Sequence, residues 1–203
     1  FNTPAPSAIR NPQSAIRTRI IGVIENQAPT RALIRDLPVQ DGLVVGDPAQ
    51  DVCQIALVER HRATGGVTNG FVHGFGFNAP CAVATTVAHD SHHMIVVGTD
   101  KGNMALAANR LGEVGGGVVV YKDGRELALV ELPIAGLMSD ERAEVVAAKA
   151  ARMVAAMAAC GCTLNNAYMQ LSLLALVVIP ELRISDLGLV DVTRFEVVDL
   201  FVD

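Results

Sequence analysis

Short apolar runs separated by turn residues follow one another along most of the chain. Runs of this length, rich in Val and Ile and bounded by Gly, Pro, Asn and Asp, are typical of β-strands. Asp123 and Gly124 separate two of the runs and predict a hairpin. The runs cover residues 19–25, 33–45, 55–58, 82–88, 94–97, 118–121, 126–131 and 195–202.

A helical pattern is clearest at residues 101–114, where apolar residues recur at positions i, i+3, i+4 and i+7. These residues are Met104, Ala107, Ala108 and Leu111. Three glycines, at 115–117, follow the segment and favour the end of a helix. With the strands expected at 94–97 and 117–121, the helix predicts a β-α-β unit with a right-handed crossover.

A second helix is expected over residues 140–159, with Ser139 as its N-cap and many alanines along its length. Residues 171–178 form a buried element whose type the pattern leaves open. The segment is too short to span a membrane, which takes about 20 apolar residues. The expected fold class is α+β, a mixed α/β sandwich with two main helices near 101–114 and 140–159.

The beginning of the chain gives weaker signals. Residues 1–18 contain three prolines among Asn, Ser and Gln, and we expect them to be poorly structured. Residues 19–45 are typical of the edge of a β-structure, and we expect its partner strands upstream of Phe1. Because the first residue is Phe and not Met, the chain is expected to be processed or a piece of something larger.

Composition narrows the class of protein. Of 203 residues, 51% are hydrophobic and 18% charged, which excludes an intrinsically disordered chain. The net charge of −5 and the absence of a long basic run argue against a nucleic-acid partner. No signal-peptide pattern opens the chain. The four cysteines, at 53, 81, 160 and 162, are expected to be free thiols of a reducing cytoplasm, without a membrane partner.

All five histidines lie in one third of the chain, at positions 61, 73, 89, 92 and 93. His89, Asp90, Ser91 and His92 separate two strand-like runs, so they are expected to form an accessible turn at a strand end. Imidazole binds zinc and iron, a carboxylate can orient or join it, and histidine also moves protons near neutral pH.

We therefore take His89, Asp90 and His92 as candidate catalytic residues, and His89 and His92 as candidate metal ligands. A polar turn that only satisfies nearby backbone groups explains the same pattern, and the two interpretations stay open. His73 is expected to be structural, whereas His61 fits either role.

Several known enzyme patterns are missing from the sequence. It contains neither a Gly-x-Ser-x-Gly elbow nor a Walker motif. The zinc-deaminase pattern Pro-Cys-x-x-Cys begins at Pro80 but meets Ala84 where the second cysteine would stand. Cys160 and Cys162 are too close for a Cys-x-x-Cys site.

Four stretches carry a more specific signal. They are residues 58–65 (VERHRATG), 85–92 (TTVAHDSH), 131–139 (ELPIAGLMS) and 178–192, which begin VIPELR and end GLVDV. In order and spacing they resemble the C-terminal region of bacterial adenine deaminases, of the amidohydrolase superfamily, over residues 51–202. The family more often has Lys where His73 stands and Pro where Val177 stands, and neither departure touches the histidine turn.

The resemblance implies a metal-dependent hydrolysis of adenine to hypoxanthine and ammonia, a purine-salvage reaction. In it, a metal-activated water attacks the carbon that bears the amino group, and a carboxylate relays the proton to the leaving amine. The divalent metal of the full-length enzyme is expected to be Mn, Fe or Zn, and the fragment itself could be free of metal. The family's main metal site lies in a (β/α)8 barrel that begins with a His-x-His pair, which this sequence lacks.

A barrel takes about 250 residues, so this chain is expected to lack it and to be inactive alone. Residues 1–50 are then the tail of the β-subdomain beside the barrel, and residues 51–203 the C-terminal domain. The implied partners are adenine, the enzyme's own N-terminal barrel and further copies in a homo-oligomer.

Three roles remain open for the domain. His89, Asp90 and His92 could face the barrel mouth, where they would touch substrate, hold an accessory metal or exclude water. Alternatively, the domain is purely structural or an oligomerisation domain without catalytic residues, which the Ala-rich segment 140–159 favours because small residues allow close packing. An isolated metal-binding module ranks third, since the sequence offers one incomplete ligand cluster.

Overall fold

The computed structural model describes residues 1–6 and 15–202. The strands are β1 (Ile16–Val23), β2 (Thr30–Leu37), β3 (Val39–Gln40), β4 (Leu43–Val44), β5 (Val52–Val58), β6 (Val67–His73), β7 (Cys81–Thr85), β8 (Met94–Gly98), β9 (Gly117–Lys122), β10 (Arg125–Glu131), β11 (Leu182–Ser185), β12 (Gly188–Asp191) and β13 (Glu196–Val198). The helices are η1 (Pro48–Gln50), α1 (Lys101–Glu113), α2 (Ala143–Ala159) and α3 (Ala167–Leu173). This content confirms the predicted α+β class.

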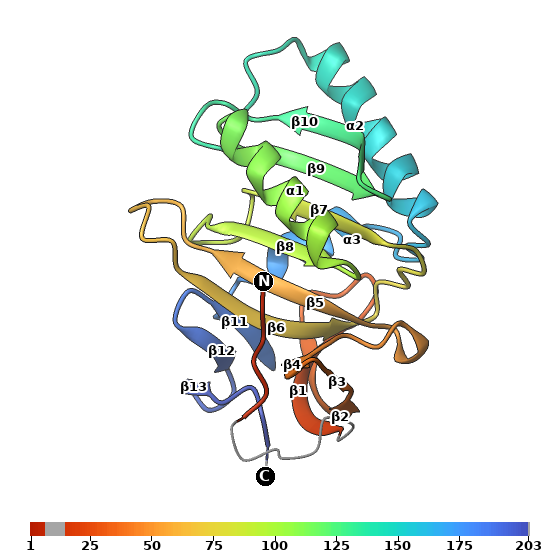
Figure 1. The fold of residues 1–203 in the computed structure, drawn as a ribbon. Coiled ribbons are helices and arrows are strands. Elements are labelled where there is room, and N and C mark those ends of the chain that lie inside the picture. The colour runs from red at the N-terminus through yellow and green to blue at the C-terminus, as the bar shows by residue number, and fades with distance from the viewer. Residues whose placement is uncertain (7–14, 203) are drawn as a thin grey trace.

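An eight-stranded sheet organises the described residues, in the order β10-β9-β7-β8-β5-β6-β1-β2 (Figure 1). Neighbouring strands pair antiparallel, apart from the short parallel pairing of β1 with β6. The expected β-α-β unit is present in a split form. Because β8 and β9 are both antiparallel to β7, they run parallel to each other with β7 between them.

Helix α1 covers one face of the sheet. Asp100 caps it by accepting a hydrogen bond from the backbone N–H of Asn103 at 2.7 Å. Its buried residues Met104, Ala107 and Leu111 pack on the side chains of β7, β8 and β9 that point to this face. Three of the four residues of the predicted stripe are therefore the ones that the helix buries.

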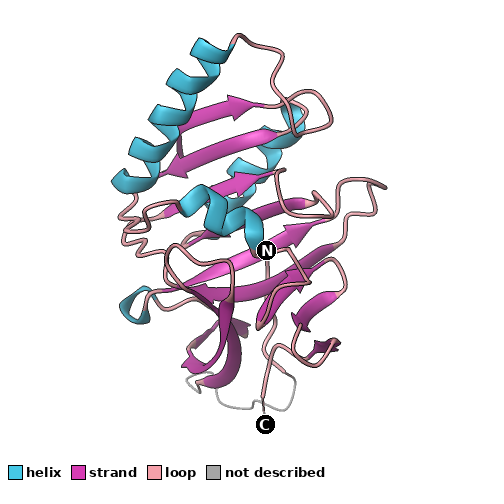
Figure 2. Cartoon of the chain, turned by 180° about the vertical axis from the view of Figure 1, so that it is seen from behind, coloured by secondary structure: helices cyan, strands magenta, loops and turns pink. Residues whose placement is uncertain are grey.

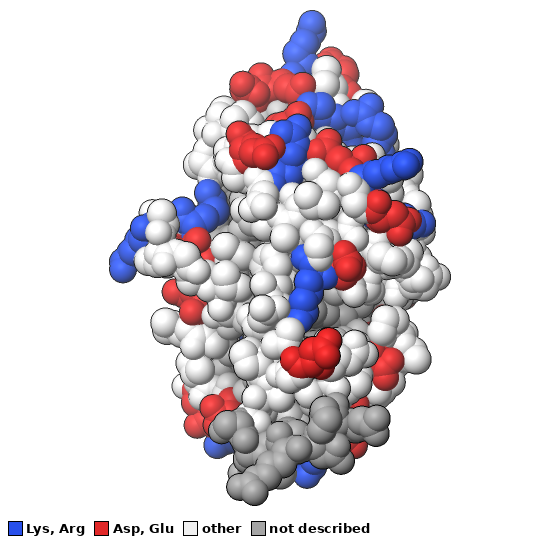
Figure 3. Space-filling view, viewed as in Figure 1, with Lys and Arg blue, Asp and Glu red and all other residues white. Residues whose placement is uncertain are grey.

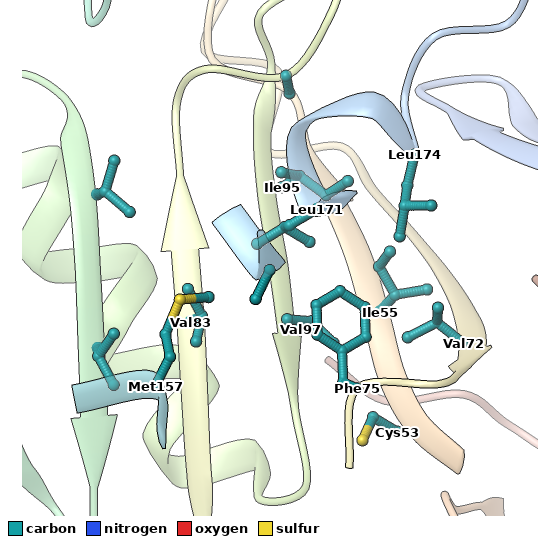
Figure 4. Packing of buried hydrophobic residues seen from close by; sticks show 14 of the residues in the cluster. Cys53, Ile55, Val72, Phe75, Val83, Ile95, Val97, Met157, Leu171 and Leu174 are labelled. Carbon is teal, nitrogen blue, oxygen red and sulfur yellow. The ribbon is translucent and has the colours of Figure 1, made fainter. Parts of the chain in front are cut away.

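The other face holds the larger core, beneath α2, α3 and the three-stranded sheet β11-β12-β13 (Figure 2). Figure 4 shows Met157 of α2 over Val83 of β7, and Leu171 of α3 beside Ile95 of β8. Strand residues alternate between the two faces, so successive apolar residues of β7, β8 and β9 serve different cores.

Several expectations need correction. Ser139 is not the N-cap: α2 starts at Ala143 after Arg142, and the Ser139 hydroxyl accepts from the Glu141 N–H at 3.2 Å in a local turn. The open element at 171–178 is the end of α3 followed by turns. The closing strand is only β13, which starts at Glu196.

The N-terminal expectations were also partly wrong. Strand β1 finds its partners, β2 and β6, within this chain and not upstream of it, although β2 does form the edge of the sheet. Of the first 18 residues, 7–14 lie outside the described part. Thr3 accepts a backbone hydrogen bond from Val44, and Ile16 begins β1, so these two positions are ordered parts of the fold.

Acidic and basic side chains are interspersed on the surface seen in Figure 3, around a broad uncharged band. All four cysteines are free, as predicted, with Cys53, Cys81 and Cys160 buried. None of the described helices has the length and apolar character needed to cross a membrane.

Candidate functional site

The antiparallel order brings three connections to one end of the sheet. Strands β5, β7 and β10 all finish there, on the left in Figure 1. Residues 59–61 follow β5, residues 89–93 lie between β7 and β8, and residues 133–138 follow β10. We call these three segments the histidine end.

The predicted turn is present, and backbone hydrogen bonds fix it at both sides. The N–H of His92 donates to the carbonyl of Ala88 at 2.7 Å, and the N–H of His89 donates to Ser172 of α3 at 3.0 Å. His92 has a φ of 52°, a left-handed conformation that few non-glycine residues adopt. The rings of His89 and His92 meet edge to face with centroids 5.4 Å apart, so the structure brings these two candidates together.

Each of the three candidate side chains has a polar atom without a hydrogen-bond partner among the described residues. Asp90 is exposed, and within the described residues neither its carboxylate nor the His89 ring makes a hydrogen bond. The Nδ1 atom of His92 is buried without a hydrogen-bond partner among those residues. Burial is the main cause that lowers the pKa of His92, helped by the neighbouring His89, so the neutral imidazole is favoured.

Two side chains from the β5–β6 connection hold this turn. Arg60 donates from Nε to the carbonyl of His92 at 2.6 Å and from a terminal nitrogen to the carbonyl of Ala135 at 2.9 Å. The Nε2 atom of His61 is 2.6 Å from the carbonyl oxygen of Ser91. His61, which the sequence left open, therefore contacts the candidate turn.

A second polar cluster lies behind the turn. His93 is buried, with Nδ1 4.0 Å from a carboxylate oxygen of Glu59 and Nε2 3.9 Å from Asp186. Its ring centroid is 4.8 Å from that of His61. Hydrogen bonds from the backbone N–H groups of Thr64 and others lower the pKa of Glu59 to about 2, so the carboxylate stays ionised and shapes the loop.

Sequence reasoning missed most of this supporting structure. Arg60 and Glu59 were visible only as part of the family-like stretch 58–65, with no role attached. Thr86, which follows β7, is buried and holds two other segments: it donates to the carbonyl of Gly136, after β10, at 2.6 Å and accepts from the N–H of Gly117, the first residue of β9, at 2.8 Å. His73 ends β6 at the opposite end of the sheet, away from the other four histidines.

The residues present do not form a complete metal site. Among the described residues, no three His, Cys, Asp or Glu side chains are arranged to hold an ion. Protein zinc sites use three or four protein ligands, and His89 with His92 supplies two.

A second concave feature lies beneath α2. It is an apolar cavity of about 430 Å³ between α2, α3 and the β9–β10 side of the sheet. Val87, two residues before His89, contributes to its wall together with Leu137 of the connection after β10. The cavity and the histidine end are thus adjacent, but the first is apolar and the second polar.

Comparison with known proteins fits this arrangement. The sequence model described as adenine deaminase C-terminal domain matches residues 27–196, which is most of the chain. The chain belongs to this family. The matched segment of the adenine deaminase C-terminal domain includes all three parts of the histidine end.

Full-length relatives are similar throughout the chain. "Adenine deaminase" of Mesorhizobium japonicum is 73% identical over 202 residues, which cover 100% of this chain and 33% of the relative. The protein of the same name from Paracoccus denitrificans is 68% identical over 98% of the chain and 33% of its own length. That of Moorella thermoacetica is 47% identical with the same coverage. This adenine deaminase C-terminal domain thus spans about a third of the relatives it matches.

Proposed function

We propose that this chain is the C-terminal part of an adenine deaminase, a hydrolase that converts adenine and water to hypoxanthine and ammonia. The observation that supports this most is the high identity to proteins named adenine deaminase over the whole chain. The chain supplies a domain that packs on a catalytic barrel outside residues 1–203. Residues 1–50 lie next to that barrel as the tail of its β-subdomain, and residues 51–203 are the C-terminal domain.

His89, Asp90 and His92 face the barrel mouth in this proposal. The position of His89 and His92 side by side on this turn supports the role, together with the neutral state that burial favours for His92, because a neutral imidazole can accept a proton. The exposed Asp90 adds a carboxylate on the same turn. The main ligands of the divalent metal, Mn, Fe or Zn, lie in the barrel. Adenine binds there, and the enzyme works in the cytoplasm.

Single substitutions in the full-length enzyme test the role of the turn. H89N, D90N and H92N are expected to lower kcat/KM for adenine by about 10²-fold or more where the residue moves a proton. H73N is the matched control, because it makes the same change at the opposite end of the sheet. Wild-type kcat/KM in all three turn variants would refute the proposed role.

Metal content separates two roles for the turn. If the histidines act on substrate or water, H89N and H92N keep the metal of the full-length enzyme by elemental analysis and lose activity. If they hold an accessory ion, metal is lost in step with activity. The chain alone is expected to release no ammonia from adenine, and measurable release by pure chain would contradict a catalytic barrel elsewhere.

A second candidate function, a structural or oligomerisation domain without catalytic residues, is favoured by α2. Of its 17 residues only Met153, Ala156 and Met157 are buried. Val154 is 67% exposed, and most of the outer surface of the helix is alanine. A small, apolar helix face of this kind can pack closely on a second copy. The mass of the full-length enzyme in solution, with and without a charge on α2, tests this function.

A further inference from the structure

Arg60 is the side chain that connects all three segments of the histidine end. It follows β5, its Nε donates to His92 between β7 and β8, and a terminal nitrogen donates to Ala135 after β10. Partial burial lowers the pKa of Arg60, which nevertheless stays protonated at neutral pH. Among the described residues Arg60 hydrogen-bonds to backbone carbonyls and forms no ion pair, so these hydrogen bonds hold the guanidinium in place.

The shorter of the two hydrogen bonds from Arg60 goes to His92, a residue with an unusual backbone conformation. His92 has a positive φ, and its carbonyl belongs to the peptide group that leads to His93, the residue before β8. Arg60 fixes the direction of this carbonyl, while His61 contacts the preceding carbonyl of Ser91 at 2.6 Å. Because the His92 ring and its carbonyl share one Cα, fixing the carbonyl restricts where the ring can point.

The connection after β10 leaves space for the guanidinium because it has a glycine at position 136. A Cβ atom placed on Gly136 would lie 2.9–3.0 Å from three atoms of the Arg60 head group. Gly136 also has a φ of +73°, so both space and backbone favour glycine there. The flat guanidinium thus lies against the Gly136 backbone and donates in two directions, which a lysine ammonium group cannot reproduce.

We propose that Arg60 is a positioning residue for catalysis, which holds the His92 imidazole in its productive direction by fixing the His92 carbonyl. The inference rests on the proposed function, since it gives Arg60 an effect on the reaction only through the turn. Arg60 itself touches neither substrate nor reacting atoms in this proposal.

The test uses R60A in the full-length enzyme, with R62A as the matched control. Arg62 is exposed in the same loop, and within the described residues its side chain makes no hydrogen bond. A misplaced catalytic group can cost about 10²-fold in rate, so R60A is expected to lose that much kcat with little change in KM. R62A is expected to behave as wild type, since it removes the same charge without releasing the turn.

Two further measurements separate positioning from general structural support. Free guanidinium ion is expected to restore part of the kcat of R60A, because it can occupy the space and donate to the same carbonyls. The double variant R60A/H92N is expected to be little worse than H92N, because residues that act as a unit have non-additive effects. Fully additive losses, or R60A with wild-type kcat beside an impaired H92N, would overturn the inference alone.

The failure of the proposed function has a different signature. If H89N, D90N and H92N all keep wild-type kcat/KM, the turn has no part in the reaction whatever R60A does. If R60A does not fold, R60K decides, because lysine keeps the charge but cannot donate to both carbonyls in the observed geometry. A lowered kcat with unchanged KM in R60K supports the inference, and wild-type kcat contradicts it.

Discussion

The histidine end and the outer face of α2 are fixed in opposite ways. At the histidine end, side chains of Arg60, His61 and Thr86 bind backbone carbonyls of neighbouring connections at 2.6–2.9 Å. Helix α2 has no side-chain N-cap and buries three of its 17 residues. Its polar links to the sheet are Lys149 with Glu131 of β10, at 2.6 Å, and Lys122 of β9 with the carbonyl of Ala159, at 2.8 Å. Lys149 also pairs with Glu141, in the turn before the helix.

This difference supports the proposal that the histidine end takes part in the chemistry. Directional hydrogen bonds to carbonyls specify where each atom of a turn lies, as a catalytic group requires. Small apolar residues allow two surfaces to pack closely, but such packing is not directional and fixes few atomic positions. The two functions proposed for the chain therefore belong to two different regions and can be tested separately.

The largest effect is expected beneath the histidine end. Arg183 is fully buried and donates to the carbonyls of Ile179, Leu173 and Ala28, which secures α3 under the turn. Burial lowers its pKa to about 10. R183M removes the donor from the carbonyls of Ile179 and Ala28, whereas the Leu173 carbonyl keeps the N–H of Leu176 at 3.0 Å. The variant should reduce the free energy of unfolding by about 3–5 kcal/mol in urea denaturation. R194M, which removes an exposed arginine, should have a free energy of unfolding near that of wild type. If R183M and R194M lost the same free energy, burial of Arg183 would not explain its contribution.

A smaller loss is expected at Thr86. T86V keeps the shape of the side chain but removes the hydroxyl that joins Gly136 and Gly117. The two buried backbone groups then lack a partner, which should cost about 1–3 kcal/mol by thermal or urea unfolding. T193V is the control, because Thr193 is exposed and makes no hydrogen bond among the described residues. Unchanged stability in T86V would mean that the connections hold their places without this link.

The loop that carries Arg60 should respond to acid. The pKa of Glu59 falls from 4.5 to about 2 on folding, mainly through the backbone N–H of Thr64. Its stabilising contribution is therefore complete above pH 4.5 and is lost as the pH falls towards 2. E59Q should be less stable than wild type at pH 7, with the difference closing between pH 4.5 and 2. A constant difference across that range would contradict the assignment.

The outer face of α2 should tolerate charge. Because Val154 is 67% exposed, V154E should change the free energy of unfolding by no more than about 0.5 kcal/mol. The mass of the full-length enzyme, measured by light scattering, then distinguishes the two regions. A lower mass with unchanged kcat would assign assembly to α2 and chemistry elsewhere, whereas unchanged mass would remove this helix from any oligomer interface.

Short sequence patterns predicted the elements that depend on interactions between residues close in sequence. Helix α1 has the predicted apolar stripe, and the hairpin of β9 and β10 has Asp123 and Gly124 at its turn. Ser139 looked like a cap because a serine before two acidic residues is typical of one, but the chain makes a further turn before Ala143. The parallel pairing of β1 with β6 joins residues about fifty positions apart, and no short pattern encodes it.

The candidate site shows the same limit. His89 and His92 are three residues apart, so the sequence alone suggested that they share a turn. Arg60 reaches His92 across 32 positions and Ala135 across 75, and these contacts exist only because β5, β7 and β10 finish at one end of the sheet. The action of the turn on substrate stays a prediction.

The most direct test of the central claim is a crystal structure of the full-length enzyme with a non-hydrolysable purine bound. The account predicts that His89 or His92 lies within about 3 Å of the purine or of an ordered water in contact with it. Arg60 should still donate to the His92 carbonyl in that structure. A turn that faces bulk solvent, on the side of the domain away from the purine, would contradict the account.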